Sequence, residues 1–260
     1  MSIEVVHLHG FKCAGTTLAT LLAHNFGTTF RCVESTKRAG RLPWSQVVGH
    51  PDLVGIRAVS SHTITPPPQG TGSLVIGLVR SPAERLISAW RFFQQQSKQP
   101  DFPFSGYLKR QSKLKNYQSR LYSPQFAVVH DGLPLWGQHF NHMQLGHNYF
   151  LGTVDRYAES LVIIQYLLSL RGINFRAFIS TENAASSSDN KTAPDAPIPE
   201  AYLNVDKLLY RRCNELINAF REVIPDFEPR LKALEQRGPE ESQFRQLVDS
   251  ENFLQIPVPL

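Results

Sequence analysis

The chain has little cysteine and no long apolar segment. Its three cysteines, Cys13, Cys32 and Cys213, lack the spacing of a metal site or a redox motif, which argues against a disulfide scaffold and fits a reducing compartment. No run of about 18 apolar residues is present, and no apolar segment follows a charged N-terminus. The sequence therefore predicts neither a transmembrane segment nor a signal peptide, and we expect a cytoplasmic protein.

The excess of positive charge is modest, because 27 Lys and Arg against 22 Asp and Glu give a formal net charge of +5. This balance suits a small anionic ligand. Nucleic-acid binding would rest on charge alone, so we expect no nucleic-acid partner. A length of 260 residues with 42% hydrophobic content predicts one sizeable core and a single domain over 1–260.

Apolar runs alternate with helical periodicity along the chain. Strands are predicted at 3–9, 53–62, 73–79, 148–154 and 173–179, and helices at 16–26, 82–96, within 104–122, at 156–170 and at 200–220. This alternation predicts βαβ units and an α/β fold with a mostly parallel sheet. We place the core at 1–225, with an insertion at 123–147, a low-complexity segment at 182–199 and a C-terminal extension at 226–260.

Three polar clusters follow predicted strands: the loop 9–17, the Ser60–Ser61–His62 run, and Arg80 with Ser81. Parallel sheets of this class bind ligands at the carboxyl ends of their strands. We therefore expect all three clusters to meet at one edge of the sheet.

The first cluster contains "HLHGFKCAGTT", His7 to Thr17, in which Gly10 and Gly15 have the spacing of the Walker A motif G-x-x-x-x-G-K-[ST]. Thr16 stands where that motif has its lysine, and Lys12 lies inside the loop instead. The start of the following helix offers backbone N–H groups to an anion, and Lys12 adds a positive charge. A plain glycine turn with a surface lysine is the alternative. The predicted anion-binding residues are Lys12, Cys13, Ala14, Gly15, Thr16 and Thr17.

The second cluster is "RSPAERLIS", which places Arg80 at a strand end and Ser88 two turns into a helix. A guanidinium binds phosphate through two parallel hydrogen bonds, and a serine hydroxyl adds a third. The alternatives are a pair between Arg80 and Glu84, and a packing role for Ser88.

Together, "FKCAGTT" and "RSPAERLIS" resemble two motifs of the sulfotransferases that use 3′-phosphoadenosine 5′-phosphosulfate (PAPS), Pro-Lys-x-x-Gly-Thr-[Ser/Thr] and Arg-[Asp/Asn/Ser]-Pro-x-x-Arg-x-x-Ser. Phe11 stands in place of the proline. The resemblance implies a P-loop-like three-layer αβα fold and PAPS as cosubstrate. It also implies that the loop holds the 5′-phosphosulfate, while Arg80 and Ser88 hold the 3′-phosphate.

Three further segments, "KNYQSRLY" (115–122), "FLGTVDRYAESLVII" (150–164) and "NVDKLLY" (204–210), resemble the branch of heparan-type 2-O-sulfotransferases and their bacterial relatives. The resemblance covers about residues 1–220. It implies an acceptor hydroxyl on a carbohydrate or another small molecule. Asn116, Gln118 and Arg120 are expected to line the acceptor side or to brace the cofactor loop, with a plain polar helix face as the alternative.

Sulfuryl transfer to a hydroxyl needs charge neutralisation at the leaving phosphate and a general base. We assign the first role to Lys12 and the second to His62, because a histidine with its ordinary pKa of about 6.5 is a competent base at neutral pH. Glu34 is the reserve base. We expect no metal requirement. Two alternatives stay open, a P-loop kinase of a small molecule and a non-catalytic nucleotide-binding module; a kinase would need a lysine at position 16.

Overall fold

The computed structural model describes residues 3–36, 41–68, 70–110, 114–122, 148–180, 193–237, 239–240 and 253–257. The insertion predicted at 123–147 and most of the low-complexity segment lie outside these residues. Among the residues described, no helix combines the length and the apolar character that crossing a membrane requires.

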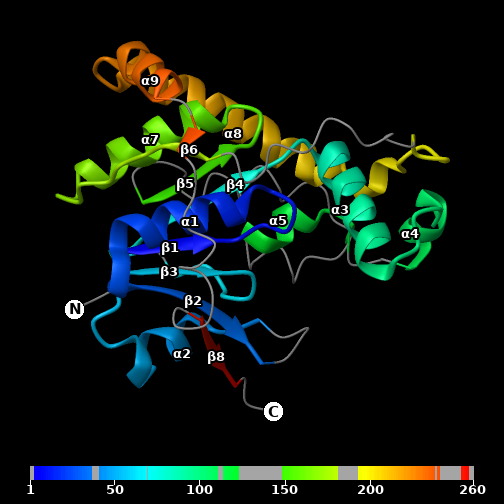
Figure 1. The fold of residues 1–260 in the computed structure, drawn as a ribbon, viewed down its shortest axis with the longest axis horizontal. Coiled ribbons are helices and arrows are strands. Elements are labelled where there is room, and N and C mark those ends of the chain that lie inside the picture. Colours follow the sequence, from blue (N-terminus) through cyan, green and yellow to red (C-terminus); the bar gives the residue numbers. More distant parts are fainter. Residues whose placement is uncertain are drawn as a thin grey trace.

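A six-stranded parallel sheet forms the centre of the molecule (Figure 1). In spatial order its strands are β5 (Tyr149–Thr153), β4 (Leu74–Val79), β1 (Val5–Leu8), β3 (Ala58–Ser61), β2 (Phe30–Ser35) and β8 (Phe253–Ile256). Every neighbouring pair in this sheet is parallel. The prediction of an α/β fold with a parallel sheet is therefore confirmed.

Helices cover both faces of the sheet, and the alternation of side chains along β1 explains why. Val5 packs into a cluster with α1 (Gly15–Phe26), α7 (Tyr157–Ser169) and α9 (Phe227–Gln236). Val6, which points to the opposite face, packs into a second cluster with α2 (Trp44–Val48), α5 (Tyr117–Tyr122) and the first half of α8 (Asn204–Val223). The result is a layered arrangement of helix, sheet and helix.

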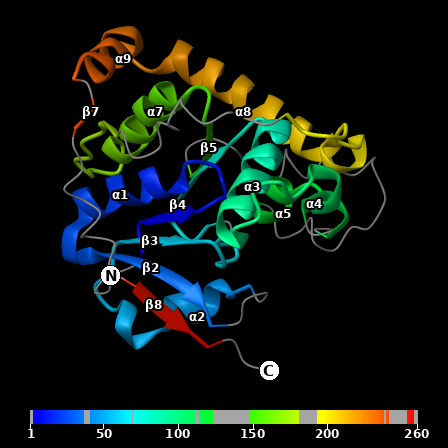
Figure 2. The same ribbon diagram turned by 45° about the vertical axis from the view of Figure 1, so that its right-hand side comes forward.

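A small third cluster lies beside the carboxyl end of the sheet. It joins α3 (Pro82–Ser97) to α4 (Phe104–Arg110) through buried aromatic side chains such as Trp90 and Phe104, whose rings meet edge to face. Figures 1 and 2 show α3, α4 and α5 at the end toward which the strands point. These three helices thus border the edge where ligands of parallel sheets bind.

The strand prediction at 173–179 was wrong for most of its length. Residues 173–178 form no strand, and only β6 (Ile179–Ser180) follows them, paired with β7 (Pro239–Glu240) rather than with the central sheet. The side chain of Asn25 on α1 explains the difference, because it accepts from the backbone N–H of Arg176 and donates to the carbonyl of the same residue. One side-chain amide thus makes the hydrogen bonds that a neighbouring strand would make, while Phe175 is buried in the core.

The strand predicted at 53–62 is shorter, since β3 comprises only Ala58–Ser61. Two strands of the sheet were not predicted. β2 extends the sheet beyond β3, and β8 lies at its edge, although its residues fall in the predicted C-terminal extension.

Candidate functional site

The loop between β1 and α1 has an unusual backbone. Lys12 has a φ of 63° and Ala14 a φ of 55°, both in the left-handed region that non-glycine residues rarely adopt. The N–H of Cys13, between them, donates to the carbonyl of Gly10 at 3.1 Å. Left-handed residues in such a turn make a concave set of backbone N–H groups that suits an anion. α1 begins directly after it at Gly15, so the N–H groups at the start of this helix adjoin the turn.

Both loop glycines are required by close packing. A Cβ atom on Gly15 would lie 2.0 Å from Cδ2 of His9, and one on Gly10 would lie 2.4 Å from the hydroxyl oxygen of Tyr122. Neither distance is possible between such atoms, so a larger residue at either position displaces the loop. The Walker-like spacing therefore corresponds to two real packing constraints.

Two positive side chains lie beside the loop. Nζ of Lys12 lies 4.6 Å from the ring centre of Phe92, and partial burial, followed by the nearby Arg80, lowers the pKa of its ammonium group. Arg80 pairs with Glu84, with 3.5 Å between Nε and Oε2, so that alternative holds in this structure. An exposed pair of this kind contributes little, and an anion can displace it. Ser88 follows Glu84 by four residues, which places both on one side of α3.

His62 and Glu34 lie together at the ends of β3 and β2. The backbone N–H of His62 donates to Oε1 of Glu34 at 2.8 Å, and the hydroxyl of Thr63 donates to Oε2 at 3.0 Å. Burial raises the pKa of Glu34, while these two hydrogen bonds oppose the rise. Both carboxylate oxygens are thus occupied in holding the turn that carries His62.

The imidazole of His62 is held by the first residue of the loop. Its Nδ1 lies 2.7 Å from the carbonyl oxygen of His9, and the two rings have their centres 3.8 Å apart. A carbonyl oxygen only accepts, so Nδ1 carries the hydrogen. Nε2 of neutral His62 is consequently the atom with a free lone pair, as a general base requires.

A column of histidines extends from His62 into the sheet. His7 is fully buried on β1, its Nδ1 lies 2.9 Å from the hydroxyl of Ser60, and its ring stacks on that of His9 at 5.3 Å. Burial, followed by the charge of His62, lowers the pKa of His7 to about 3 and that of His9 well below its ordinary value. Both rings are therefore neutral at physiological pH.

Ser60 was predicted only as part of the Ser60–Ser61–His62 cluster, and no role was predicted for His7. The sequence signal that could have identified this pair is a polar residue within each of two mainly apolar segments, which form β1 and β3. His7 and Ser60 are paired in the register of β1 and β3.

Two of the three residues expected on the acceptor side, Asn116 and Gln118, form hydrogen bonds to other segments of the chain. Oδ1 of Asn116 accepts from the N–H groups of Val205 and Asp206 and thereby caps α8. Gln118 is buried and bonds to Cys13 and to the backbone of Arg80. The contacts of Gln118 favour the role of bracing the loop, whereas those of Asn116 hold the start of α8 and not the loop. Arg120 is half-buried on the same short helix, where burial lowers its pKa.

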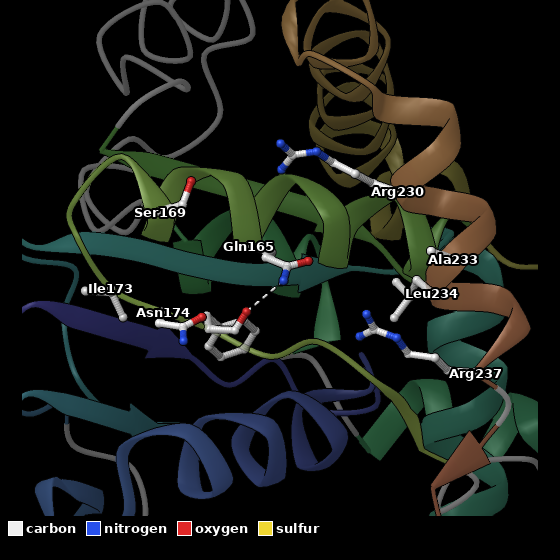
Figure 3. Close-up of a pocket in the computed structure, with 9 residues that line it drawn as sticks. Gln165, Ser169, Ile173, Asn174, Arg230, Ala233, Leu234 and Arg237 are labelled. Carbon is white, nitrogen blue, oxygen red and sulfur yellow. Dashed lines mark hydrogen bonds between the residues drawn. The ribbon is translucent and has the colours of Figure 1, made fainter.

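A separate hollow of about 250 Å³ lies between α7 and α9 (Figure 3). Arg230 on α9 and Arg237, which directly follows α9, extend toward it, and the amide of Gln165 donates to the carbonyl of Phe175 at 2.8 Å. Gln165 belongs to the second half of α7, which runs away from the carboxyl end of β5. The hollow therefore contains none of the predicted site residues.

Comparison with protein-family models and with curated proteins returned no match to this chain.

Proposed function

We propose that the protein is a PAPS-dependent sulfotransferase that acts on a hydroxyl group of a carbohydrate or another small molecule. One observation carries the proposal: the carbonyl of His9, where the anion-binding loop begins, holds the imidazole of His62 at 2.7 Å. A candidate base and a candidate phosphate loop are thus tied together at the carboxyl edge of a parallel sheet. The same edge carries Lys12 and Arg80, whose charges suit a bisphosphate.

In this proposal each residue has a separate task. Nε2 of His62 accepts the proton of the acceptor hydroxyl as its oxygen attacks sulfur in line. The S–O bond to the nucleotide breaks, and Lys12 neutralises the charge that develops on the departing 5′-phosphate. The N–H groups of residues 14–17 hold that phosphate, while Arg80 and Ser88 hold the 3′-phosphate.

The left-handed loop supports this assignment of Lys12. Lys12 lies in a turn with a φ of 63°, and its Nζ lies over the ring of Phe92. A cation–π contact of this kind is worth about 0.5–2 kcal/mol, which a fully charged phosphate can outcompete. Among the residues that the structure describes, Lys12 forms no ion pair with a carboxylate.

Glu34 fits a supporting role better than that of the base. Its two oxygens accept hydrogen bonds from the N–H of His62 and the hydroxyl of Thr63, so both are already engaged within the protein even though burial raises the pKa of the carboxyl group. We therefore assign proton acceptance to His62. Glu34 orients the backbone from which the imidazole extends.

The function is tested by turnover with PAPS and a panel of sugars, oligosaccharides and phenols, with release of adenosine 3′,5′-bisphosphate as the readout. We expect release that depends on one acceptor class, and a loss of about 10²–10⁴ in kcat in His62→Ala with nucleotide affinity retained. Formation of ADP from ATP and magnesium, without consumption of PAPS, would instead identify a kinase. Nucleotide binding without turnover on any acceptor would identify a binding module.

A further inference from the structure

The short helix α5 (Tyr117–Tyr122) contacts both of the proposed phosphate-holding turns. The hydroxyl of Tyr117 accepts the N–H of Phe11 in the loop at 3.2 Å. The next residue, Gln118, contacts Cys13 in the same loop and Arg80 at the end of β4. One segment of the chain thus connects two turns that are some 70 residues apart in sequence.

The side chain of Gln118 makes this connection with every polar atom that it has. Its Oε1 accepts from the thiol of Cys13 at 3.3 Å and from the N–H of Arg80 at 2.8 Å, and its Nε2 donates to the carbonyl of Arg80 at 3.0 Å. The residue is 0% exposed, so water does not compete for these groups. A single amide therefore links the backbone of Arg80 to the loop beyond the point where the pairing of β1 and β4 ends.

The helix that carries Gln118 is itself held in place. Asp206, buried on α8, accepts from the backbone N–H groups of Gln118 and Ser119 at 3.2 and 2.8 Å, and from the hydroxyl of Ser119 at 2.7 Å. The guanidinium of Arg85 lies 4.8 Å over the ring of Tyr117. With its backbone held in this way, Gln118 has little freedom to follow a movement of either turn.

We propose that Gln118 is a positioning residue that sets the distance between the loop and Arg80, and through it the preference for a nucleotide phosphorylated at both the 3′ and the 5′ position. This inference rests on the proposed function, in which the loop holds the 5′-phosphate and Arg80 the 3′-phosphate. A ligand that binds both turns at once benefits from a fixed distance, because its second phosphate finds the second site already in place. The affinity for a ligand with only a 5′-phosphate does not depend on that distance.

The test compares the Kd of adenosine 3′,5′-bisphosphate with that of adenosine 5′-phosphate, measured by calorimetry on the full chain. Gln118→Met removes all three hydrogen bonds while keeping a similar volume. We expect it to lower the ratio of the two affinities at least about tenfold relative to the wild type, mainly by weakening the bisphosphate. Ser119→Ala is the matched control, because it removes a buried hydrogen bond that touches neither turn. The two backbone N–H groups that bond to Asp206 still hold the helix, so the ratio should be unchanged.

A second variant keeps the test decisive if Gln118→Met does not fold. Gln118→Glu retains the acceptor for Cys13 and the N–H of Arg80 but loses the donor to the carbonyl of Arg80, so it should lower the ratio as well. An unchanged ratio in a folded Gln118 variant, with both affinities reduced in parallel, would mean that Gln118 only stabilises the fold and would overturn the inference. A wild type without preference for the second phosphate would overturn the proposed function along with it.

Discussion

Protonation of the buried histidine His7 should destabilise the protein as the pH falls from about 6.5. In the folded chain its pKa is about 3 against an ordinary 6.5, because burial opposes the charged ring and His62 adds repulsion. Between these two values the unfolded chain binds a proton that the folded chain does not. The stability that comes from neutral His7 is therefore complete above pH 6.5 and is lost as the pH falls toward 3.

The size of the effect follows from the same two values. The difference between the two pKa values of His7 corresponds to about 5 kcal/mol in the free energy of unfolding. By pH 5, about 2 kcal/mol of this stability is already lost. Because typical domains are stable by only about 5–15 kcal/mol, a loss of this size is readily measured. His9, whose pKa is also well below its ordinary value, acts in the same direction.

The assay is urea unfolding at pH 7.5, 6.5, 5.5 and 5.0 for the wild type and His7→Asn, in which an amide replaces the imidazole beside Ser60. We expect the wild type to lose about 2 kcal/mol more than the variant between pH 7.5 and 5.0. Groups common to both proteins cancel in this difference. His24→Asn, which removes an exposed histidine of α1, should follow the wild-type curve. Parallel curves for the wild type and His7→Asn would refute the argument that burial keeps His7 neutral.

Three further predictions concern the loop, α8 and the base. Gly15→Ala should abolish nucleotide binding without unfolding the sheet, because its Cβ would lie 2.0 Å from the ring of His9; unimpaired affinity in calorimetry would contradict the packing argument. Asn116→Ala should cost about 1–2 kcal/mol in urea unfolding, because it removes the cap of α8. A loss below about 0.3 kcal/mol would mean that other groups replace the cap. Glu34→Gln retains one acceptor oxygen for the N–H of His62 and should keep kcat within about tenfold, whereas His62→Ala should lower it by about 10²–10⁴. The reverse order of effects would make Glu34 the base.

Local sequence patterns predicted the parts of the fold that local sequence determines. β4 reads LVIGLV and is buried throughout, and α1 has leucines on one face, so both were predicted. β2 was missed because Arg31, Cys32 and Glu34 interrupt its apolar pattern, FRCVES. Its place in the sheet depends on pairing with β3, which is not visible in a local window.

Contacts between distant segments account for the other differences. Residues 173–178 have the alternation of a strand, but the amide of Asn25, some 150 residues earlier, takes the hydrogen bonds of Arg176. Likewise, the sequence left open whether Gln118 lines the acceptor side, braces the cofactor loop or lies on a plain polar helix face. Its burial and its bonds to Cys13 and Arg80 come from the packing of α5, which the spacing of residues does not reveal.

The most direct test of the proposed function is a calorimetric titration with adenosine 3′,5′-bisphosphate, without magnesium, on the wild type and Arg80→Ala. Arg230→Ala, which removes an exposed arginine of α9 beside the separate hollow, controls for the loss of one positive charge. We expect micromolar binding to the wild type and the control, and affinity about 10- to 100-fold weaker in Arg80→Ala, as for loss of a hydrogen bond to a charged group. Failure of the wild type to bind the bisphosphate, with binding of ATP and magnesium instead, would contradict the assignment of the loop to PAPS.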